Sequence, residues 1–284
     1  MVELKFNQPV PVPEQLCHKF EHMQNVFAQE WPFYADDPAK RDPMHASDVI
    51  VKTVRSALER EVRVNLHRHP ITIRLDGDVL VLEGEVYDIA AKKLALGLAA
   101  AVAGVRGIVD RLHLVPSERK GDGAIRDVCV KFVLGEPTLR NCDVRVRHKG
   151  RVDALRRVEP DAAGNIEIAV QDGVITLDGE VGSLSHKRMA GVLAWWTPGR
   201  RDVVDGLEVV PPQVDSDNEI EEALRLVFEA NPVLDPDQIR ISSRASVITL
   251  DGHVATYAEK ALAELDAWYL FGVDKVVNKL QVIK

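Results

Sequence analysis

Hydrophobic and polar residues follow one pattern in three stretches of this chain. Residues 71–115, 166–210 and 239–283 align without a gap, at constant offsets of 95 and then 73 residues. Each stretch begins with two isoleucines that are separated by one residue, such as Ile71 and Ile73, and this period of two predicts a strand with one buried face. A turn and a second strand follow. The pattern therefore predicts one structural unit that is repeated three times.

A helix is predicted after the second strand of each copy, and it should stop at a glycine that takes a positive φ angle. One apolar position of this helix is expected to face the sheet, while a nearby lysine is expected to extend to solvent. The second strand is expected to end at a glycine that permits a bulge or a sharp exit. In chain order these shared positions are Gly84, Gly179 and Gly252; Lys92, Lys187 and Lys260; Leu94, Met189 and Leu262; and Gly104, Gly199 and Gly272.

A further helix is predicted ahead of each copy, starting near Ser47 or Asp48, at Asp122 and near Ser216, with a capping residue before the apolar positions. The order helix, strand, strand, helix, strand predicts an α+β module in which two helices cover one face of a three-stranded sheet. Residues 1–45 contain five prolines before position 40, and they are predicted to form an N-terminal extension with one helix near residues 14–29. The predicted modules cover residues 46–116, 121–211 and 215–284.

This repeated unit resembles the BON domain, a small module of bacterial osmotic-stress and nodulation proteins. The resemblance depends on the motif Thr-Leu-Asp-Gly-Glu/His-Val, the lysine of the following helix, and the glycine ahead of the last strand. The third copy matches best, with Val247–Val254, Lys260 and Gly272. It implies association with phospholipid or membrane surfaces and with envelope stress, and it implies no catalytic residues. The first copy departs most, with Leu80-Val-Leu-Glu83 in place of Ile-Thr-Leu-Asp.

An insertion in the middle copy supplies the main candidate binding site. The chain spends residues 135–165 between the first helix and the first strand, where the other copies have short connections. Within residues 143–159 six basic and three acidic side chains give a net charge of +3, and the alternation around Lys149-Gly150 predicts a hairpin at about 142–160. The hairpin either contacts anionic headgroups or an acidic partner, or is an edge guarded against aggregation by its charges. The basic residues are Arg145, Arg147, Lys149, Arg151, Arg156 and Arg157.

A second candidate surface lies at the end of the second helix of the middle copy, where Trp195 and Trp196 precede Arg200 and Arg201. Tryptophan beside arginine is typical of an interfacial membrane anchor. The third copy carries Trp-Tyr at the equivalent positions, and this recurrence favours packing between modules.

The composition limits the other function classes. A net charge of −8 opposes binding to nucleic acid by the whole molecule. The chain shows no signal peptide and no long apolar span, and its three cysteines are odd in number, so we expect a cytoplasmic location. His18 and His22 beside Cys17 lack further ligands, so we predict no metal site. Gly121-Asp122-Gly123 is interpreted as a helix cap and not as a phosphate loop.

Taken together, the sequence predicts a non-enzymatic binding protein without a cofactor. The favoured ligand is an anionic phospholipid or membrane surface. The alternative is a protein scaffold, or a protein that assembles with itself, through sheet edges or the Trp-bearing helices. No nucleophile beside a base and no paired acid and base support an enzyme.

Overall fold

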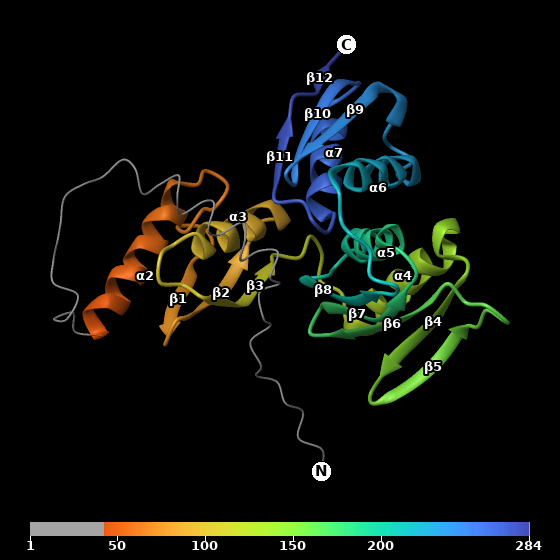
Figure 1. The fold of residues 1–284 in the computed structure, drawn as a ribbon, viewed down its shortest axis with the longest axis horizontal. Coiled ribbons are helices and arrows are strands. Elements are labelled where there is room, and N and C mark those ends of the chain that lie inside the picture. Colours follow the sequence, from red (N-terminus) through yellow and green to blue (C-terminus); the bar gives the residue numbers. More distant parts are fainter. Residues whose placement is uncertain (1–42, 284) are drawn as a thin grey trace. The chain divides into compact units, whose positions relative to one another are not determined.

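The computed structural model describes residues 43–283, with side chains from residue 47 onward (Figure 1). The predicted helix near residues 14–29 and the Cys17, His18 and His22 group lie outside the described residues, while residues 43–45 of the predicted extension belong to helix α2 (Pro43–Arg60). The described chain divides into two compact units near His113. The first unit holds one copy of the repeat and the second holds two copies. The predicted α+β class and its three tandem copies are confirmed.

The first copy forms a three-stranded sheet in the order β1-β2-β3, in which β1 and β2 are antiparallel. Helix α2 precedes the sheet in the chain, and helix α3 connects β2 to β3. The elements are α2 (Pro43–Arg60), β1 (Ile71–Asp76), β2 (Val79–Val86), α3 (Ile89–Ala100) and β3 (Gly107–Leu114).

The middle copy has a five-stranded sheet in the order β5-β4-β6-β7-β8, because an inserted pair of strands extends the repeated three. Strand β4 runs parallel to β6, and β7 runs parallel to β8. Helix α5 contacts the sheet strands β7 and β8. The elements are α4 (Asp122–Gly135), η2 (Pro137–Leu139), β4 (Cys142–His148), β5 (Arg151–Arg156), β6 (Gly164–Gln171), β7 (Val174–Val181), α5 (Leu184–Trp196) and β8 (Asp202–Val209).

The third copy repeats the plan, and its last strand is divided in two. Strand β10 pairs with β9 on one side and with β11 and then β12 on the other. Figure 1 shows α6 and α7 on the same side of this sheet. The elements are α6 (Asp217–Ala230), η3 (Pro236–Gln238), β9 (Ile239–Arg244), β10 (Val247–Val254), α7 (Tyr257–Tyr269), β11 (Lys275–Asn278) and β12 (Gln281–Val282).

Two of the three predicted helix caps are wrong. Helix α2 begins at Pro43, so Ser47 and Asp48 lie inside it. Asp122 does not cap α4; its carboxylate accepts hydrogen bonds from the backbone N–H groups of Asp172 and Gly173, at 3.0 and 2.9 Å, and so holds the β6–β7 turn. Ser216 does cap α6, as predicted, by accepting from the Glu219 N–H at 3.3 Å.

The core of each copy forms between the sheet and the two helices. The isoleucines predicted to face inward are each at most 8% exposed: Ile71, Ile73, Ile166, Ile168, Ile239 and Ile241. At the helix position predicted to face the sheet, Met189 is buried while Leu94 and Leu262 are half-buried. Two alanines one turn apart in this helix are fully buried in every copy, and their small side chains let the helix lie close to the sheet. They are Ala95 and Ala99, Ala190 and Ala194, and Ala263 and Ala267.

The shared glycine lies within the second strand and does not end it. Strand β2 continues past Gly84 to Val86, and the other copies behave alike. The φ angles are positive, at 153° for Gly84, 120° for Gly179 and 121° for Gly252. A Cβ atom on Gly84 would lie 2.6 Å from the Pro70 carbonyl oxygen on the first strand side. Glycine is therefore needed because two backbones meet there.

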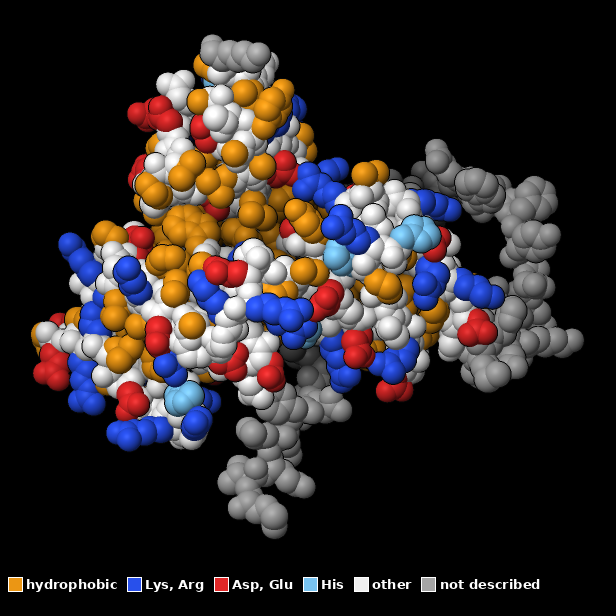
Figure 2. Space-filling view, turned by 180° about the vertical axis from the view of Figure 1, so that it is seen from behind, with side chains coloured by type: hydrophobic (Ala, Val, Ile, Leu, Met, Phe, Trp, Pro, Cys, Tyr) orange, Lys and Arg blue, Asp and Glu red, His pale blue; other side chains and the backbone are white. Residues whose placement is uncertain are grey.

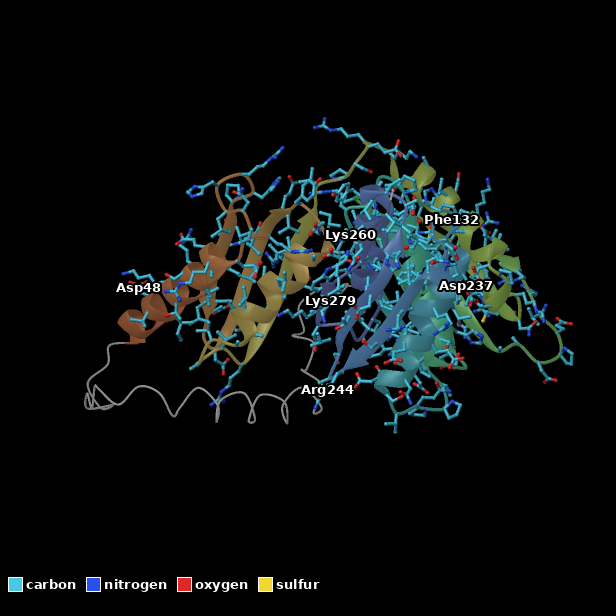
Figure 3. All side chains as sticks on the ribbon, turned by 90° about the horizontal axis from the view of Figure 1, so that it is seen from above. Asp48, Phe132, Asp237, Arg244, Lys260 and Lys279 are labelled. Carbon is cyan, nitrogen blue, oxygen red and sulfur yellow. The ribbon has the colours of Figure 1, made fainter. Side chains whose placement is uncertain are left out.

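The predicted solvent-facing lysine is buried or half-buried, so that prediction is wrong. Its ammonium donates a hydrogen bond to the backbone carbonyl of a leucine in the last strand, and Lys92 is only 5% exposed. The donor and acceptor pairs are Lys92 to Leu112 at 2.7 Å, Lys187 to Leu207 at 2.7 Å and Lys260, labelled in Figure 3, to Leu280 at 2.5 Å.

The same leucine is held at its N–H group by an acidic or amide side chain two residues earlier. Asp110 accepts from the Leu112 N–H at 2.9 Å, and its carboxylate also lies 2.9 Å from the Lys92 ammonium. Asp205 and Asn278 take the same position in the other copies. The N–H and C=O groups of one leucine are thus both hydrogen-bonded to side chains. These bonds position the last strand relative to the helix.

We predict that Gly84→Ala destabilises the first unit by about 2–4 kcal/mol, because its Cβ would displace the backbone of the first strand. The matched control is Gly97→Ala within α3, where a Cβ meets nothing within 4 Å. That substitution should stabilise the same unit by up to about 1 kcal/mol. Urea unfolding followed by circular dichroism measures both, and equal effects of the two variants would contradict the role of Gly84.

Candidate interaction surface of the middle module

The inserted strands β4 and β5 form a two-stranded ribbon at one edge of the middle sheet. They run antiparallel, and they are joined by Lys149 and Gly150, whose φ angles are 49° and 77°. Two successive residues with positive φ make the turn that matches the twist of a hairpin. These strands occupy the segment in which the sequence predicts a hairpin.

The two strands of this ribbon differ in burial. On β4 the alternate residues Cys142, Val144 and Val146 are at most 8% exposed, so one face of the strand belongs to the core. Strand β5 is exposed along almost its whole length. It carries two large apolar side chains, Val152 and Leu155, which are 46% and 47% exposed. The outer strand therefore offers apolar surface as well as charge.

Three of the six predicted basic residues form ion pairs on the surface. Arg145 lies 3.6 Å from Asp143, and Arg151 lies 3.0 Å from Asp153. Arg147 pairs with Glu167 on β6. All three arginine side chains are between 45% and 82% exposed, so each pair contributes at most about 1 kcal/mol and does not remove the arginine from solvent.

Arg156 forms hydrogen bonds to the backbone of its own domain. Its guanidinium donates to the backbone carbonyls of Cys142, at 2.9 Å, and Leu139, and it reaches that of Leu134 at 3.4 Å. Leu134 lies in the last turn of α4, where the carbonyl groups lack partners within the helix and carry partial negative charge. Arg156 thus fastens the base of the hairpin to the end of α4.

Lys149 and Arg157 are exposed, and neither forms an ion pair with any residue of the described chain. Lys149 lies in the turn, and Arg157 directly follows β5. At about 3.3 Å per residue, the strand separates them by roughly 25 Å. Figure 2 shows several basic side chains at the lower left, on the side of the molecule where Figure 1 places β5. These two cations are the ones most available to a ligand.

The predicted tryptophan and arginine surface is occupied by the third module. Trp195 is 7% exposed and stacks on Tyr269 at 5.5 Å between ring centroids. Arg200 donates to the Tyr269 hydroxyl at 2.6 Å and lies over both rings. The Trp196 indole N–H donates to Asp266 at 2.7 Å. Within the second unit these side chains therefore pack between two modules, the role that the sequence favours for the tryptophans.

Arg201 lies apart from this cluster, at the β6–β7 turn. Its backbone N–H donates to the Gly173 carbonyl at 2.8 Å, and its side chain is half-buried beside that glycine. The structure therefore does not bring Arg201 together with the basic residues of the hairpin.

Sequence reasoning missed Arg188, which is 1% exposed and lies in the same module contact. Its guanidinium donates to the carboxylate of Asp215 and to the Phe271 carbonyl, the latter at 3.2 Å. The repeat alignment gives no signal for this role, because the equivalent residues are Lys93 and Ala261.

Asp266 is the buried acid of this contact. It accepts from Trp196 and, at 2.7 Å, from the Asn231 side chain. Burial raises the pKa of Asp266 to about 6, although both hydrogen bonds favour its ionised form. Burial likewise raises the pKa of Asp205 to about 6, against the pull of nearby Lys187. The second unit thus contains two carboxyl groups that titrate near pH 6.

The other candidate groups for chemistry in the described residues are two buried cysteines and one surface depression. Burial raises the pKa of the Cys129 thiol to about 12 and also raises that of Cys142, so neither is a thiolate nucleophile near neutral pH. In residues 43–283 no three histidine, cysteine or acidic side chains gather as metal ligands.

A depression of about 290 Å³ at the hairpin base is lined in part by Asp143, Arg145 and Glu180. No helix in the described chain is long and apolar enough to cross a bilayer.

The described chain therefore contains three small α+β modules, one of which carries an exposed basic and apolar ribbon. A family model for the BON domain matches residues 47–116, 149–211 and 216–284. The chain belongs to the BON domain family and contains three tandem copies of this domain. The middle match begins at the hairpin turn, so α4 and β4 lie outside it, as expected for an insertion within one domain.

Comparison with curated proteins gives no match. Two solved structures of CdsD, a structural protein of the type III secretion system of Chlamydia trachomatis, show low similarity. The C-terminal domain of CdsD is 11% identical, with 83% of this chain and 98% of that chain covered and a TM-score of 0.21. The second structure is 12% identical, with 83% and 92% covered and a TM-score of 0.20. Likenesses at this level carry no argument about function.

We predict that Arg156→Gln destabilises the second unit by about 1–3 kcal/mol, because it leaves backbone carbonyls at the hairpin base without their charged donor. Its neighbour provides the control: Arg157→Gln removes the same charge from an exposed side chain and should change stability by less than about 0.5 kcal/mol. Thermal unfolding of the two variants makes the comparison, and equal melting temperatures would contradict the structural role of Arg156.

The raised pKa of Asp266 predicts a pH dependence with a definite sign. Between the unfolded pKa near 3.8 and the folded pKa of about 6, the native state binds the extra proton. The contribution of Asp266 to the free energy of unfolding therefore falls as pH rises through this window, by up to about 3 kcal/mol. Asp266→Asn should remove this part of the slope in urea unfolding measured from pH 4.5 to 7.5.

The control for this experiment is Asp237→Asn, which replaces an exposed carboxylate of the same domain, labelled in Figure 3. It should leave the slope unchanged. A slope that is the same in Asp266→Asn and in the unmodified protein would show that Asp266 does not hold its proton in the folded state.

Proposed function

We propose that this protein is a non-enzymatic binding protein whose middle BON domain associates with anionic phospholipid surfaces through the β4–β5 hairpin. The observation that carries the proposal is the composition of the outer strand. Exposed Val152 and Leu155 lie between the unpaired cations Lys149 and Arg157. The family, which is associated with phospholipid and membrane-related ligands, supports the same class of ligand.

The geometry of the hairpin suits a flat surface. Strand β5 is the edge of its sheet, so it can lie along a membrane with a cation near each end and the apolar side chains between them. Each basic residue near an anionic surface contributes about 1 kcal/mol, and burial of the apolar groups adds to this. Arg145, Arg147 and Arg151 can join the contact, because their surface pairs are weak and exposed.

The net charge of −8 makes this binding local and dependent on salt. An anionic membrane repels most of the molecule, and only the hairpin is attracted within a Debye length of about 10 Å. We therefore expect an association that holds the protein reversibly, which is typical of a module that senses or follows the membrane surface.

A second candidate function, a scaffold for protein partners, is favoured by the same edge. The outer side of β5 leaves backbone groups without a neighbouring strand in the described chain, and such an edge can pair with another strand. This function predicts binding or self-association that needs no lipid.

Co-sedimentation with vesicles of phosphatidylglycerol and phosphatidylcholine tests the lipid proposal. We predict that the double variant Lys149→Glu, Arg157→Glu lowers the partition coefficient for these vesicles at least about tenfold. The physical reason is that two electrostatic attractions to the membrane become repulsions. Binding of the unmodified protein should fall steeply with added salt and should be absent with phosphatidylcholine alone.

The matched control is Lys275→Glu, Lys279→Glu, which makes the same charge change at two exposed positions of the third domain; Lys279 is labelled in Figure 3. It should bind vesicles as the unmodified protein does. The proposal fails if the unmodified protein does not bind anionic vesicles, or if both double variants lose binding equally. Self-association without lipid, abolished by a proline at Ala154, would support the scaffold instead.

A further inference from the structure

The three BON domains treat the outer edge of their first strand in three different ways. In the middle domain this strand, β6, is covered by β4, which pairs with it in parallel over six residue pairs from Cys142–Gly164 to Arg147–Ala169. In the described chain β1 and β9, the equivalent strands of the other domains, carry no such neighbour. The middle domain therefore shows what a strand added at this edge looks like.

The turns decide which backbone groups point to this edge. In the first domain Asp76 and Val79 flank a two-residue turn, so they form a hydrogen-bonded pair, and hydrogen bonding to β2 then alternates along the strand. Asp76, Arg74 and Thr72 consequently direct their backbone groups to β2. The N–H and C=O groups of Leu75, Ile73 and Ile71 point outward.

The third domain satisfies its outward groups by itself. By the same alternation, Ile239, Ile241 and Ser243 point outward from β9. The Ser243 N–H donates to the Glu221 carboxylate of α6 at 2.6 Å, and the Ile239 N–H donates to the Pro236 carbonyl of the preceding turn. These two caps block both ends of the edge, which is a common protection of exposed edge strands.

The first domain lacks both caps. Val54 and Leu58 of α2 are fully buried, as are Leu224 and Phe228 of α6, so the two helices align and Val51 stands where Glu221 stands. Valine offers no acceptor. No described residue accepts from the outward N–H groups of Ile71, Ile73 or Leu75.

We infer that β1 of the first BON domain accepts an extended segment of a partner protein as an added parallel strand, in the way that β6 accepts β4. On β4 the alternate residues Val144 and Val146 enter the core, and the residues between them are polar. A segment with apolar residues at every second position would bury them beside Ile71 and Ile73. Strand addition at an exposed edge is a general mode of peptide recognition.

The charges around β1 indicate that the intervening residues of the partner are acidic. On the open face Glu83 of β2 lies 2.6 Å from Arg74 and 3.9 Å from Arg111, so two guanidinium groups share one carboxylate. In the middle domain a cross-strand ion pair has the opposite polarity, since Arg147 on the added strand, which lies opposite Ala169, pairs with the neighbouring Glu167 on β6. An acidic residue beside Arg74 would complete the same kind of cross-strand pair.

This inference concerns the first unit and does not depend on the hairpin of the middle domain. Its test is a titration of the full chain with a heptapeptide that copies Cys142–His148, with Cys142→Ser, Arg145→Glu and Arg147→Glu. Nuclear magnetic resonance should show shifts and slowed amide exchange at Ile71, Ile73 and Leu75. The peptide that keeps both arginines should bind at least tenfold more weakly.

Two variants of the protein identify the edge and the charge separately. Val51→Gln installs a neutral acceptor where Glu221 stands in the third domain, and it should weaken binding of the acidic peptide at least tenfold, whereas Val51→Leu should not. Arg74→Glu should reverse the preference, so that the arginine peptide binds better. Arg240→Glu changes an exposed arginine on the capped strand β9 and should have no effect.

The inference is overturned if the acidic peptide does not bind, if its amide protection maps to another strand, or if Val51→Gln and Arg74→Glu both bind it as the unmodified protein does. Loss of vesicle binding in the hairpin variants leaves this result unaffected, so the two ideas fail independently.

Discussion

A buried or half-buried ammonium group that donates to a strand carbonyl links the second helix to the last strand in all three domains. The lysine of the second helix reaches the leucine carbonyl of the last strand across each domain, and a carboxylate or amide holds the N–H of that leucine. A charge that is partly removed from water needs such partners, so these hydrogen bonds restrict the position of the helix relative to the strand. The paired alanines then bring the helix onto the sheet. The interior of each small domain is thereby set by a few contacts, and its edges are left to vary.

Variation among the domains accordingly occurs at the edges. The middle domain adds a ribbon to its first strand, the third domain caps that strand with Glu221, and the first domain does neither. Two adjacent arginines of the ribbon have different roles. Arg156 binds backbone carbonyls at the base of the ribbon, whereas Arg157 extends to solvent. A repeated fold can thus carry different surfaces without change to its core.

The repeated strands could be predicted from the sequence because a period of two is a direct signature of a half-buried strand, and the isoleucines are buried as expected. The inserted segment was visible as extra length with a charge opposite to that of the chain. Other features have no such signature. A lysine that extends to solvent has the same sequence pattern as a lysine that donates a hydrogen bond to a backbone carbonyl inside the domain. Arg156 and Arg157 also cannot be distinguished in the sequence, because the structural role of Arg156 depends on backbone carbonyls that only the fold brings near it. The glycine within the second strand was detected, but its cause is a neighbouring backbone that only the structure shows.

The burial of Arg188 and Trp195 between the second and third domains affects how this chain can be divided. A fragment that ended after the middle domain would leave a guanidinium without Asp215 and an indole without the ring of Tyr269. Such a fragment would be prone to aggregation and poorly folded, although the boundary between the repeats suggests a suitable site for truncation. Gain or loss of modules during evolution would for the same reason involve these two as a pair.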